Sequence, residues 1–199
     1  YRRLNEVTIP DCYPLPEIED LCTSLSKSRI FSSADLFAGF HQIPCTEEAK
    51  VKLAVTTEFG QYTWTKMPMG TRNAPSVFQR LMDRVFRSIP RTELVIYLDD
   101  LLIHSVNEEE NIRQLEEVLQ ILIQNGLKIR PSKTELLVRE VQFCGYVIGH
   151  GKKKPNPKKV SEVRKLKSPS NKTEAQAVFG LLNYHRCFIP KFAEVAAPI

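Results

Sequence analysis

Residues 93–105 read ELVIYLDDLLIHS. Two short apolar runs, LVIYL and LLIH, flank the adjacent acids Asp99 and Asp100. Apolar and β-branched residues favour strands, whereas two neighbouring carboxylates favour a turn over the interior of a strand. This stretch therefore predicts a β-hairpin with both acids at its tip. A solvated turn without a chemical role is the alternative interpretation of an Asp-Asp pair.

A third acid follows an apolar stretch upstream. The segment RIFSSADLF (29–37) has the pattern of a strand, and Asp35 falls at or near its end. Two further strand-like runs, VKLAVTT and QYTWTK, lie between residues 51 and 66 and are separated by Glu58-Phe59-Gly60, which predicts a hairpin. Before these strands, residues 15–25 predict a helix, with one apolar stripe made by Leu15, Ile18, Leu21, Cys22 and Leu25.

Two longer helices are indicated on either side of the acidic hairpin. Asn73 looks like an N-cap, and Pro75 lies in the first turn of a helix whose apolar face is Val77, Phe78, Leu81, Met82, Val85 and Phe86. Asn107 and Glu110 have the spacing of a capping box. Gly126 marks the end of that second helix. Its apolar stripe is Ile112, Leu115, Val118, Leu119 and Leu122.

The C-terminal part begins with the strand-like runs TELLV and VQFCGYVI. After the basic stretch 152–159, the patterns PKKVSEVRKL and KTEAQAVFGLLNYHRCFI predict a separate helical unit. Without the flanks, the order is strand, hairpin insertion, helix, strand, strand, helix, strand. This order predicts an α+β fold with helices on one face of a mostly antiparallel sheet.

Composition narrows the class of protein. With 199 residues, 42% of them hydrophobic, the chain is long enough to bury a core. No apolar run approaches the roughly 20 residues that span a membrane, and the N-terminus has no signal-peptide pattern, so we expect a soluble, unsecreted protein. The five cysteines are scattered without zinc-binding spacing, which favours reduced thiols, and the four histidines show no paired ligand spacing.

Positive charge is concentrated in one region. The net charge is +5, but residues 126–172 contain thirteen Lys or Arg against three Glu, a local +10, so the rest of the chain carries −5. A basic region of this kind suits contact with a phosphate backbone, although basic tracts are often only solvated surface.

Three carboxylates placed together need a compensating cation. Their repulsion and desolvation would cost several kcal/mol, so the arrangement is physically sensible chiefly with divalent metal, and oxygen ligands favour Mg²⁺ or Mn²⁺. Two such ions about 4 Å apart would activate a primer 3′-hydroxyl, brace the α-phosphate and neutralise the departing pyrophosphate. The acids therefore predict nucleotidyl transfer.

Several strings resemble the reverse transcriptases of LTR retrotransposons of the gypsy type. YLDDLLIHS resembles the YxDD box, SSADLFAGFHQIP resembles the motif with the first catalytic aspartate, and MPMGTRNAPSVFQRLMDRVF resembles the segment that opens the long palm helix. YRRLNEVTIPDCYPLPEIEDL is similar to part of the fingers, and FGLLNYHRCFIPKFAEVAAPI is similar to the thumb. NGLKIRPSKTELLVREVQFCGYVIG resembles the lysine-containing motif followed by the primer grip. Such motifs in the same order are more specific than any one alone.

The resemblance implies a right-hand polymerase. Its parts would be partial fingers at 1–27 and 43–73, a palm at 28–42 and 74–150 with a ferredoxin-like antiparallel sheet, and a partial helical thumb at 151–199. The implied activity is that of an RNA-directed DNA polymerase from a retrotransposon Pol polyprotein. A catalytically inactive nucleic-acid-binding remnant of a mobile element is the alternative, and a nuclease with two metal ions is a weaker third.

The resemblance also implies the metal ligands. Asp35 and Asp99 would hold both ions, Asp100 would support the ion nearer the primer, and the carbonyl of Leu36 would add a backbone ligand. Asp100 could instead be a turn former behind the ligands. Lys133 would protonate the departing pyrophosphate, or else be a surface lysine.

Substrate-binding positions follow from the same motifs. Phe40 would exclude a ribose 2′-hydroxyl, or be a core aromatic. The other implied nucleotide-pocket residues are Leu36, Phe37, Gly70, Arg72 and Pro75, where Gly70 and Pro75 could equally be helix-start punctuation. Phe143, Cys144, Gly145 and Tyr146 would form the primer grip, or else a packed strand. Met69 and Arg72 depart from the family pattern, which would tune the pocket without removing the acids.

The implied partners are an RNA or DNA template with its primer, a dNTP, and further fingers, connection and RNase H regions of a larger polyprotein. No membrane partner is expected. An intracellular location, in a cytoplasmic particle or the nucleus, fits this interpretation.

Overall fold

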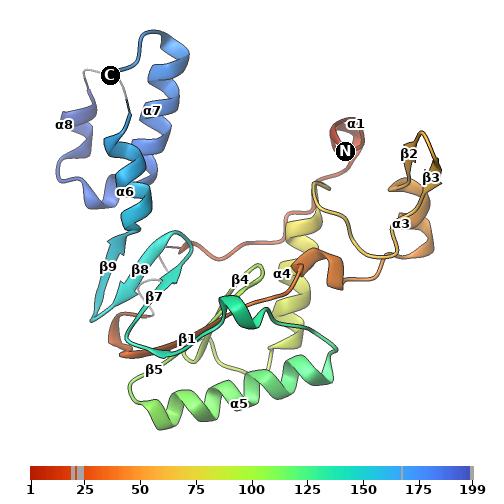
Figure 1. The fold of residues 1–199 in the computed structure, drawn as a ribbon, viewed down its shortest axis with the longest axis horizontal. Coiled ribbons are helices and arrows are strands. Elements are labelled where there is room, and N and C mark those ends of the chain that lie inside the picture. The colour runs from red at the N-terminus through yellow and green to blue at the C-terminus, as the bar shows by residue number, and fades with distance from the viewer. Residues whose placement is uncertain (19–20, 22–24, 167, 198–199) are drawn as a thin grey trace.

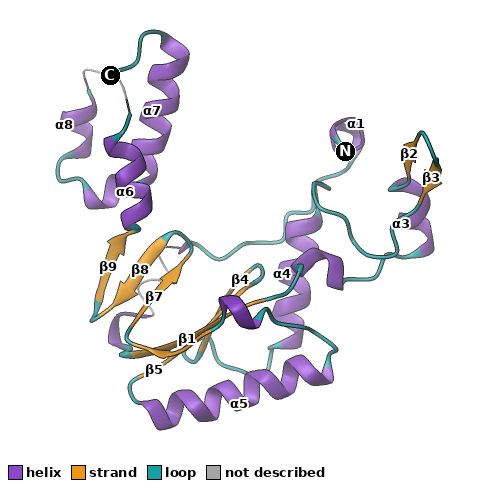
Figure 2. Cartoon of the chain, in the orientation of Figure 1, coloured by secondary structure: helices purple, strands orange, loops and turns teal. Residues whose placement is uncertain are grey.

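The computed structural model describes residues 1–18, 21, 25–166 and 168–197. At its centre lies a four-stranded sheet in the order β4-β5-β1-β6, in which every neighbouring pair is antiparallel (Figures 1 and 2). The strands are β1 (Ile30–Asp35), β4 (Leu94–Tyr97), β5 (Asp100–Ser105) and β6 (Glu135–Val138). Helices α4 (Ala74–Val85) and α5 (Glu108–Gln124) connect β1 to β4 and β5 to β6. This β-α-β-β-α-β order is ferredoxin-like, and it confirms the predicted α+β fold.

The two faces of the central sheet pack against different elements. Ala34 and Leu101 belong to a core cluster with residues of α4 and α5. Phe31 and Leu102 belong to a second cluster, with residues of a three-stranded sheet made of β7 (Glu140–Phe143), β8 (Tyr146–Gly149) and β9 (Lys152–Pro155). Side chains alternate along a strand, so Asp35 shares the face of Phe31, and Asp100 shares the face of Leu102. Both acids therefore lie on the face opposite the helices.

The two helices begin and end close to the predicted residues. Asn107 caps α5 as predicted, because its side chain accepts a hydrogen bond from the Glu110 amide at 2.8 Å. Asn73 is the N-cap residue of α4, as predicted, although its side chain makes no capping hydrogen bond. The side chain instead donates to the Ile9 carbonyl and accepts from the Asp11 amide, at 2.9 and 3.1 Å. It therefore ties the N-terminal segment to α4.

The hairpin predicted between residues 51 and 66 is shorter than expected. It consists of β2 (Val55–Thr57) and β3 (Gly60–Tyr62), while Glu47–Lys52 form helix α3. The prediction of a strand at Val51 was wrong. Thr46 caps α3 by accepting from the Ala49 amide, and ion pairs three and four residues apart stabilise the helix locally. Val51 is 76% exposed, so its alternation with polar neighbours did not reflect a buried face.

The C-terminal region is helical, as predicted. It contains α6 (Pro157–Arg164), α7 (Lys172–Tyr184), the short 3₁₀ turn η4 (Arg186–Phe188) and α8 (Phe192–Ala196). In Figure 1 these helices rise from one end of the sheets, while α1 (Arg2–Val7), α3, β2 and β3 stand at the other end. None of the described helices is both long and apolar enough to cross a membrane.

The helix predicted for residues 15–25 falls partly outside the described residues, which do not include 19–20 and 22–24. Cys22, a member of the predicted apolar stripe, lies outside the described residues. Leu25 begins the 3₁₀ turn η1 (Leu25–Lys27) and is 1% exposed, in the second core cluster.

Candidate active site

Strand pairing brings the predicted acids together. In the antiparallel register of β1 and β5, Asp35 is the Cα partner of Asp100. Beyond the end of β1, the Leu36 amide donates to the Asp99 carbonyl at 3.0 Å. The N–H and C=O of one residue in an extended chain point to the same side, so the Leu36 carbonyl also faces the hairpin. Residues 63 and 65 positions apart in the sequence thus meet at one end of the sheet.

The tip of the β4–β5 hairpin is held by a buried glutamine. Leu98 has a positive φ of 53°, a strained conformation for a residue with a side chain, and its amide donates to Gln79 Oε1 at 2.9 Å. Gln79 lies on α4 with no exposed surface, and its Nε2 donates to Asp83 Oδ1 at 3.1 Å. Gly39 also packs closely on the tip, because a Cβ there would lie 3.1 Å from the Asp99 Cβ. These contacts fix the backbone that carries Asp99.

Two cations lie at Asp35. Lys133 Nζ is 2.7 Å from Asp35 Oδ2, and Arg130 Nη1 is 4.0 Å from the same oxygen. The Asp35 side chain is only 15% exposed, whereas that of Lys133 is 59% exposed. Lys133 comes from the 3₁₀ turn η3 (Pro131–Lys133), which directly precedes β6. The predicted lysine therefore lies within reach of the predicted acids.

Burial and like charge raise the proton affinity of Asp100. Its pKa is raised to about 6, first by burial and then by the charges of Asp99 and Asp35, while Lys133 opposes the shift. The site therefore carries an excess of negative charge that a cation would relieve.

The type of donor atom at the site fits a divalent cation, but the side chains are not gathered around one point. Three carboxylates and a backbone carbonyl are the hard oxygen ligands that Mg²⁺ and Mn²⁺ prefer. Within the described residues, however, no group of three or more His, Cys, Asp or Glu side chains is arranged to hold a metal ion. The Asp35 carboxylate points instead to the Lys133 ammonium. Charge and ligand type fit the cation, and side-chain rotation would be needed to gather the ligands.

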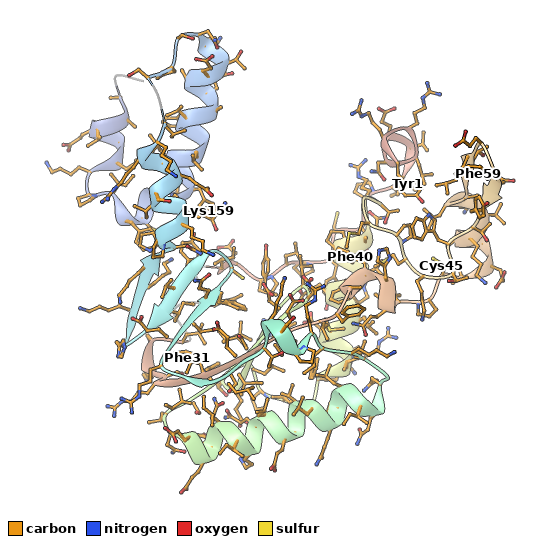
Figure 3. All side chains as sticks on the ribbon, viewed as in Figure 1. Tyr1, Phe31, Phe40, Cys45, Phe59 and Lys159 are labelled. Carbon is orange, nitrogen blue, oxygen red and sulfur yellow. The ribbon has the colours of Figure 1, made fainter. Side chains whose placement is uncertain are left out.

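Phe37 and Phe40, two of the predicted nucleotide-pocket residues, closely follow Asp35 along the chain. Phe40 packs edge-on against Phe78 of α4, with ring centroids 5.3 Å apart. Phe40, labelled in Figure 3, is only partly buried at the edge of the core. Phe37 is 52% exposed, and the Arg130 guanidinium lies 5.5 Å from its ring centroid. Pro75 occupies the first turn of α4, as expected. The contact with Phe78 fits a core aromatic, and the partial exposure of Phe40 fits a residue that limits space beneath a nucleotide sugar.

Arg72 has a structural role that the sequence did not indicate. Its guanidinium donates to the carbonyls of Asn5 and Thr8 at 3.0 and 3.4 Å. The Asn5 side chain in turn donates to the Gly70 carbonyl at 2.8 Å. Gly70 has a φ of +84°, which explains a glycine there. The hydrogen bonds of Arg72 and Gly70 therefore hold α1 against the segment before α4.

The predicted primer-grip residues form the β7–β8 hairpin. Phe143 and Tyr146 are register partners and are 3% and 5% exposed, while Cys144 and Gly145 make the two-residue turn with φ of 48° and 81°. Two positive φ values are typical of tight hairpin turns. The Tyr184 hydroxyl of α7 donates to the Cys144 carbonyl at 3.1 Å. The hairpin therefore joins the three-stranded sheet to the C-terminal helices through this contact with α7.

Several residues at the site were missed by the sequence interpretation. Gln79 is fully buried on α4, where a polar side chain needs a hydrogen-bond partner. Its signal in the sequence is that a polar residue interrupts the apolar face of the predicted helix. Arg130 and Gln42 gave no comparable signal, because Arg130 contacts Asp35 and Gln42 contacts Lys128, and both of these partners lie far away along the chain.

Comparisons with known proteins identify the family of the chain. A family model described as "Reverse transcriptase (RNA-dependent DNA polymerase)" matches residues 1–148. The whole chain is 39% identical to part of the retrovirus-related Pol polyprotein from transposon 297 of Drosophila melanogaster, and 35% identical to part of that from transposon gypsy of the same organism. It covers 19% of each of these polyproteins. It is also 34% identical to an enzymatic polyprotein of cauliflower mosaic virus, of which it covers 29%.

The solved structures that resemble the chain include the foamy viral protease-reverse transcriptase. In complex with double-stranded DNA, that protein matches 99% of this chain at a TM-score of 0.92 and 28% identity, over 34% of its own chain. In complex with an RNA/DNA hybrid, it matches all of this chain at a TM-score of 0.88, over 27% of its own. The fold is therefore that of a right-hand polymerase. The chain belongs to the reverse transcriptase family.

Proposed function

We propose that this chain is the core of an RNA-directed DNA polymerase of a retrotransposon Pol polyprotein, which adds deoxynucleotides to a primer 3′ end. The observation that carries the proposal is the β1–β5 register, in which Asp35 faces Asp100 beside Asp99 and Lys133. Because the chain spans only 19% of the transposon polyproteins it resembles, the activity of the whole protein is part of the proposal.

Asp35 and Asp99, with the Leu36 carbonyl, are the proposed ligands of two Mg²⁺ or Mn²⁺ ions, and Asp100 supports the position nearer the primer. Divalent ions bound there would supply charge stabilisation for in-line displacement at the α-phosphate. Asp35 must exchange its contact with Lys133 for this role. Lys133 would then be free to donate a proton to the departing pyrophosphate.

The remaining site residues have proposed roles in substrate recognition. Phe40 limits the space beneath the nucleotide sugar, so that a 2′-hydroxyl is disfavoured. The nucleotide is bounded by Phe37 and by the segment that contains Gly70, Arg72 and Pro75. The primer terminus is held against the acids by the β7–β8 turn, made of Phe143, Cys144, Gly145 and Tyr146.

The division into parts follows the same proposal. Residues 1–27 and 43–73 are assigned to partial fingers, residues 28–42 and 74–150 to the palm, and residues 151–199 to a partial thumb. The proposed partners are a template with its primer, a dNTP, and further fingers, connection and RNase H regions of the polyprotein. The foamy viral relatives in complex with double-stranded DNA and an RNA/DNA hybrid support such partners.

The test is primer extension by the chain on matched RNA and DNA templates, with and without Mg²⁺ or Mn²⁺. We expect metal-dependent addition of deoxynucleotides, and a loss of at least about a thousandfold in Asp99→Asn, because an essential charge is removed. Glu58→Gln, at an exposed turn, is the matched control. Extension that persists in Asp99→Asn would refute the proposal.

A second candidate is an inactive nucleic-acid-binding remnant, which the concentration of thirteen Lys or Arg in residues 126–172 favours. Salt-sensitive binding of primer–template without any incorporation would decide for this candidate. Cleavage of labelled nucleic acid without added dNTP would instead indicate a nuclease.

A further inference from the structure

The segment that carries Arg130 and Lys133 runs along the end of the first catalytic motif. Phe37 donates its amide to the Lys128 carbonyl at 2.8 Å, and the Arg130 amide donates to the Asp35 carbonyl at 2.8 Å. Leu36 and Ile129 form the antiparallel bridge between these bonds. This short ladder extends the β1 edge beyond the acid and leads directly into η3.

One side chain extends the ladder by a further step. Gln42 Nε2 donates to the Phe37 carbonyl at 2.6 Å and to the Lys128 carbonyl at 2.9 Å, and Gln42 Oε1 accepts from the Lys128 amide at 2.7 Å. The carboxamide therefore pairs with both the backbone N–H and the backbone C=O of Lys128, as a residue of a neighbouring strand would. Its partners lie 5 and 86 residues away along the chain.

This geometry needs a side chain that both donates and accepts at the reach of glutamine. A glutamate at position 42 would bring a carboxylate, which only accepts hydrogen bonds, against two carbonyl oxygens. An asparagine would offer the same groups on a side chain one methylene shorter. A methionine would keep the length but leave the Lys128 amide without its Gln42 acceptor, while the Lys128 carbonyl would keep the Phe37 amide.

We propose that Gln42 is a positioning residue that holds the cations of Arg130 and Lys133 over Asp35. Lys133 follows Lys128 by five residues, and its turn is anchored at Arg130, whose carbonyl accepts from the Lys133 amide at 3.1 Å. Loss of the Gln42 pairing would let this segment move away from the β1 edge. Lys133 would then no longer lie 2.7 Å from the Asp35 carboxylate. The kinetic consequence rests on the proposed function, whereas the structural one does not.

The kinetic test is a double-mutant cycle in primer extension by the chain, with Gln42→Met, Lys133→Ala and the double variant. We expect Gln42→Met to lower kcat about tenfold with KM for the dNTP changed less than about twofold, because the contact acts on the reacting group rather than on binding. The double variant should be no slower than Lys133→Ala within about twofold, because both changes remove one function. Gln61→Met, at an exposed position on β3, is the matched control.

The proposal would be overturned if the loss of kcat in the double variant equalled the product of the losses in the two single variants. An unchanged kcat in Gln42→Met would also overturn it. Since Gln42→Met could also disturb folding, Gln42→Asn provides a second variant, with the same expected coupling to Lys133. A thermal unfolding scan of each variant checks that the compared chains are folded.

Hydrogen exchange gives a readout that does not require activity. We expect the Lys128 amide to exchange at least about tenfold faster in Gln42→Met, and the Arg130 and Lys133 amides to follow, while β4 and β5 keep their protection. If the unmodified chain extends no primer, the proposed function fails but this measurement still decides the role of Gln42. Unchanged exchange at Arg130 and Lys133 would overturn it.

Discussion

The Asp100 carboxyl is partly buried beside the carboxylates of Asp99 and Asp35. Burial, Asp99 and Asp35 raise its pKa from 3.8 to about 6, so its ionised form is disfavoured in the fold. As pH rises from about 4 to about 6, the unfolded chain loses this proton while the folded chain keeps it, and folding stability is lost. Above pH 6 the full penalty is present, because both states are then ionised.

Asp100→Asn should therefore stabilise the chain in the absence of divalent cations. The difference in melting temperature from the unmodified chain should be close to zero near pH 4 and largest near pH 7, because only the unmodified chain has this charge to bury. Thermal unfolding at both pH values checks this expectation, with Glu58→Gln as the control. A difference that shrinks as pH rises would contradict the account of the site.

Phe40→Ala should relax the choice of sugar. Removal of the ring opens space next to Phe78, and we expect the ratio of kcat/KM for ribonucleotides to that for deoxynucleotides to rise at least about tenfold. Single-nucleotide incorporation measures the ratio, and Phe59→Ala, at a site that is 81% exposed, is the control. If the ratio stays constant while stability falls, Phe40 is only a core aromatic.

At the scale of residues, the sequence predicted the acids but not their supports. Asp35, Asp99 and Asp100 stood out because carboxylates ended or interrupted apolar runs. Gln42 and Arg130 could not be identified in this way, because their roles depend on chain segments that meet only in the fold. Arg72 was assigned to the nucleotide pocket by resemblance, whereas the contacts described for its guanidinium are with the carbonyls of Asn5 and Thr8.

Among the elements, the β7–β8 hairpin makes the sharpest structural prediction. A Cβ at Gly145 would lie 2.8 Å from the Tyr184 hydroxyl, and its φ is +81°. Gly145→Ala should therefore lower the free energy of unfolding by about 2 kcal/mol, from backbone strain together with the clash. Chemical denaturation measures the change.

Gly126→Ala is the matched control, because Gly126 has a φ of +65° and nothing within 4 Å of an added Cβ. It should cost only about 1 kcal/mol. Adding Tyr184→Phe to Gly145→Ala removes the clashing oxygen and should recover part of the loss. Equal losses for the two glycine variants would show that α7 does not press on the hairpin.

Element prediction succeeded where periodicity and caps agreed. Helix α5 had an apolar stripe, an asparagine cap and a terminal glycine, and it begins at Glu108, as that pattern predicts. Helix α3 was missed because Val51 and Val55 alternate as in a strand, while Thr46 and nearby ion pairs favour a helix. Short segments on the surface are decided by such local contacts, and a period of two is then uninformative.

Over the whole molecule, basic residues should make nucleic-acid binding depend strongly on salt. Lys152 and Lys158 are exposed in β9 and at the start of α6. Their joint replacement by alanine should reduce the slope of log K against log salt concentration by about 2, because each phosphate contact contributes about 1. Fluorescence anisotropy with a labelled primer–template measures the slope.

The matched control for this change is the joint replacement of Lys50 and Lys52 by alanine, since both form ion pairs within α3. The control should leave the slope unchanged. A slope that falls equally in both pairs of variants would mean that binding uses general charge rather than the C-terminal region.

The central claim is that Asp35, Asp99 and Asp100 share divalent cations at the end of the β1–β5 pair. The most direct measurement is Mn²⁺ binding to the chain with primer–template and dNTP, followed by electron paramagnetic resonance. We predict two bound ions for the unmodified chain, and affinity weakened at least about tenfold in Asp35→Asn and in Asp99→Asn, because each removes a charged ligand. Unchanged stoichiometry and affinity in both variants would contradict the claim.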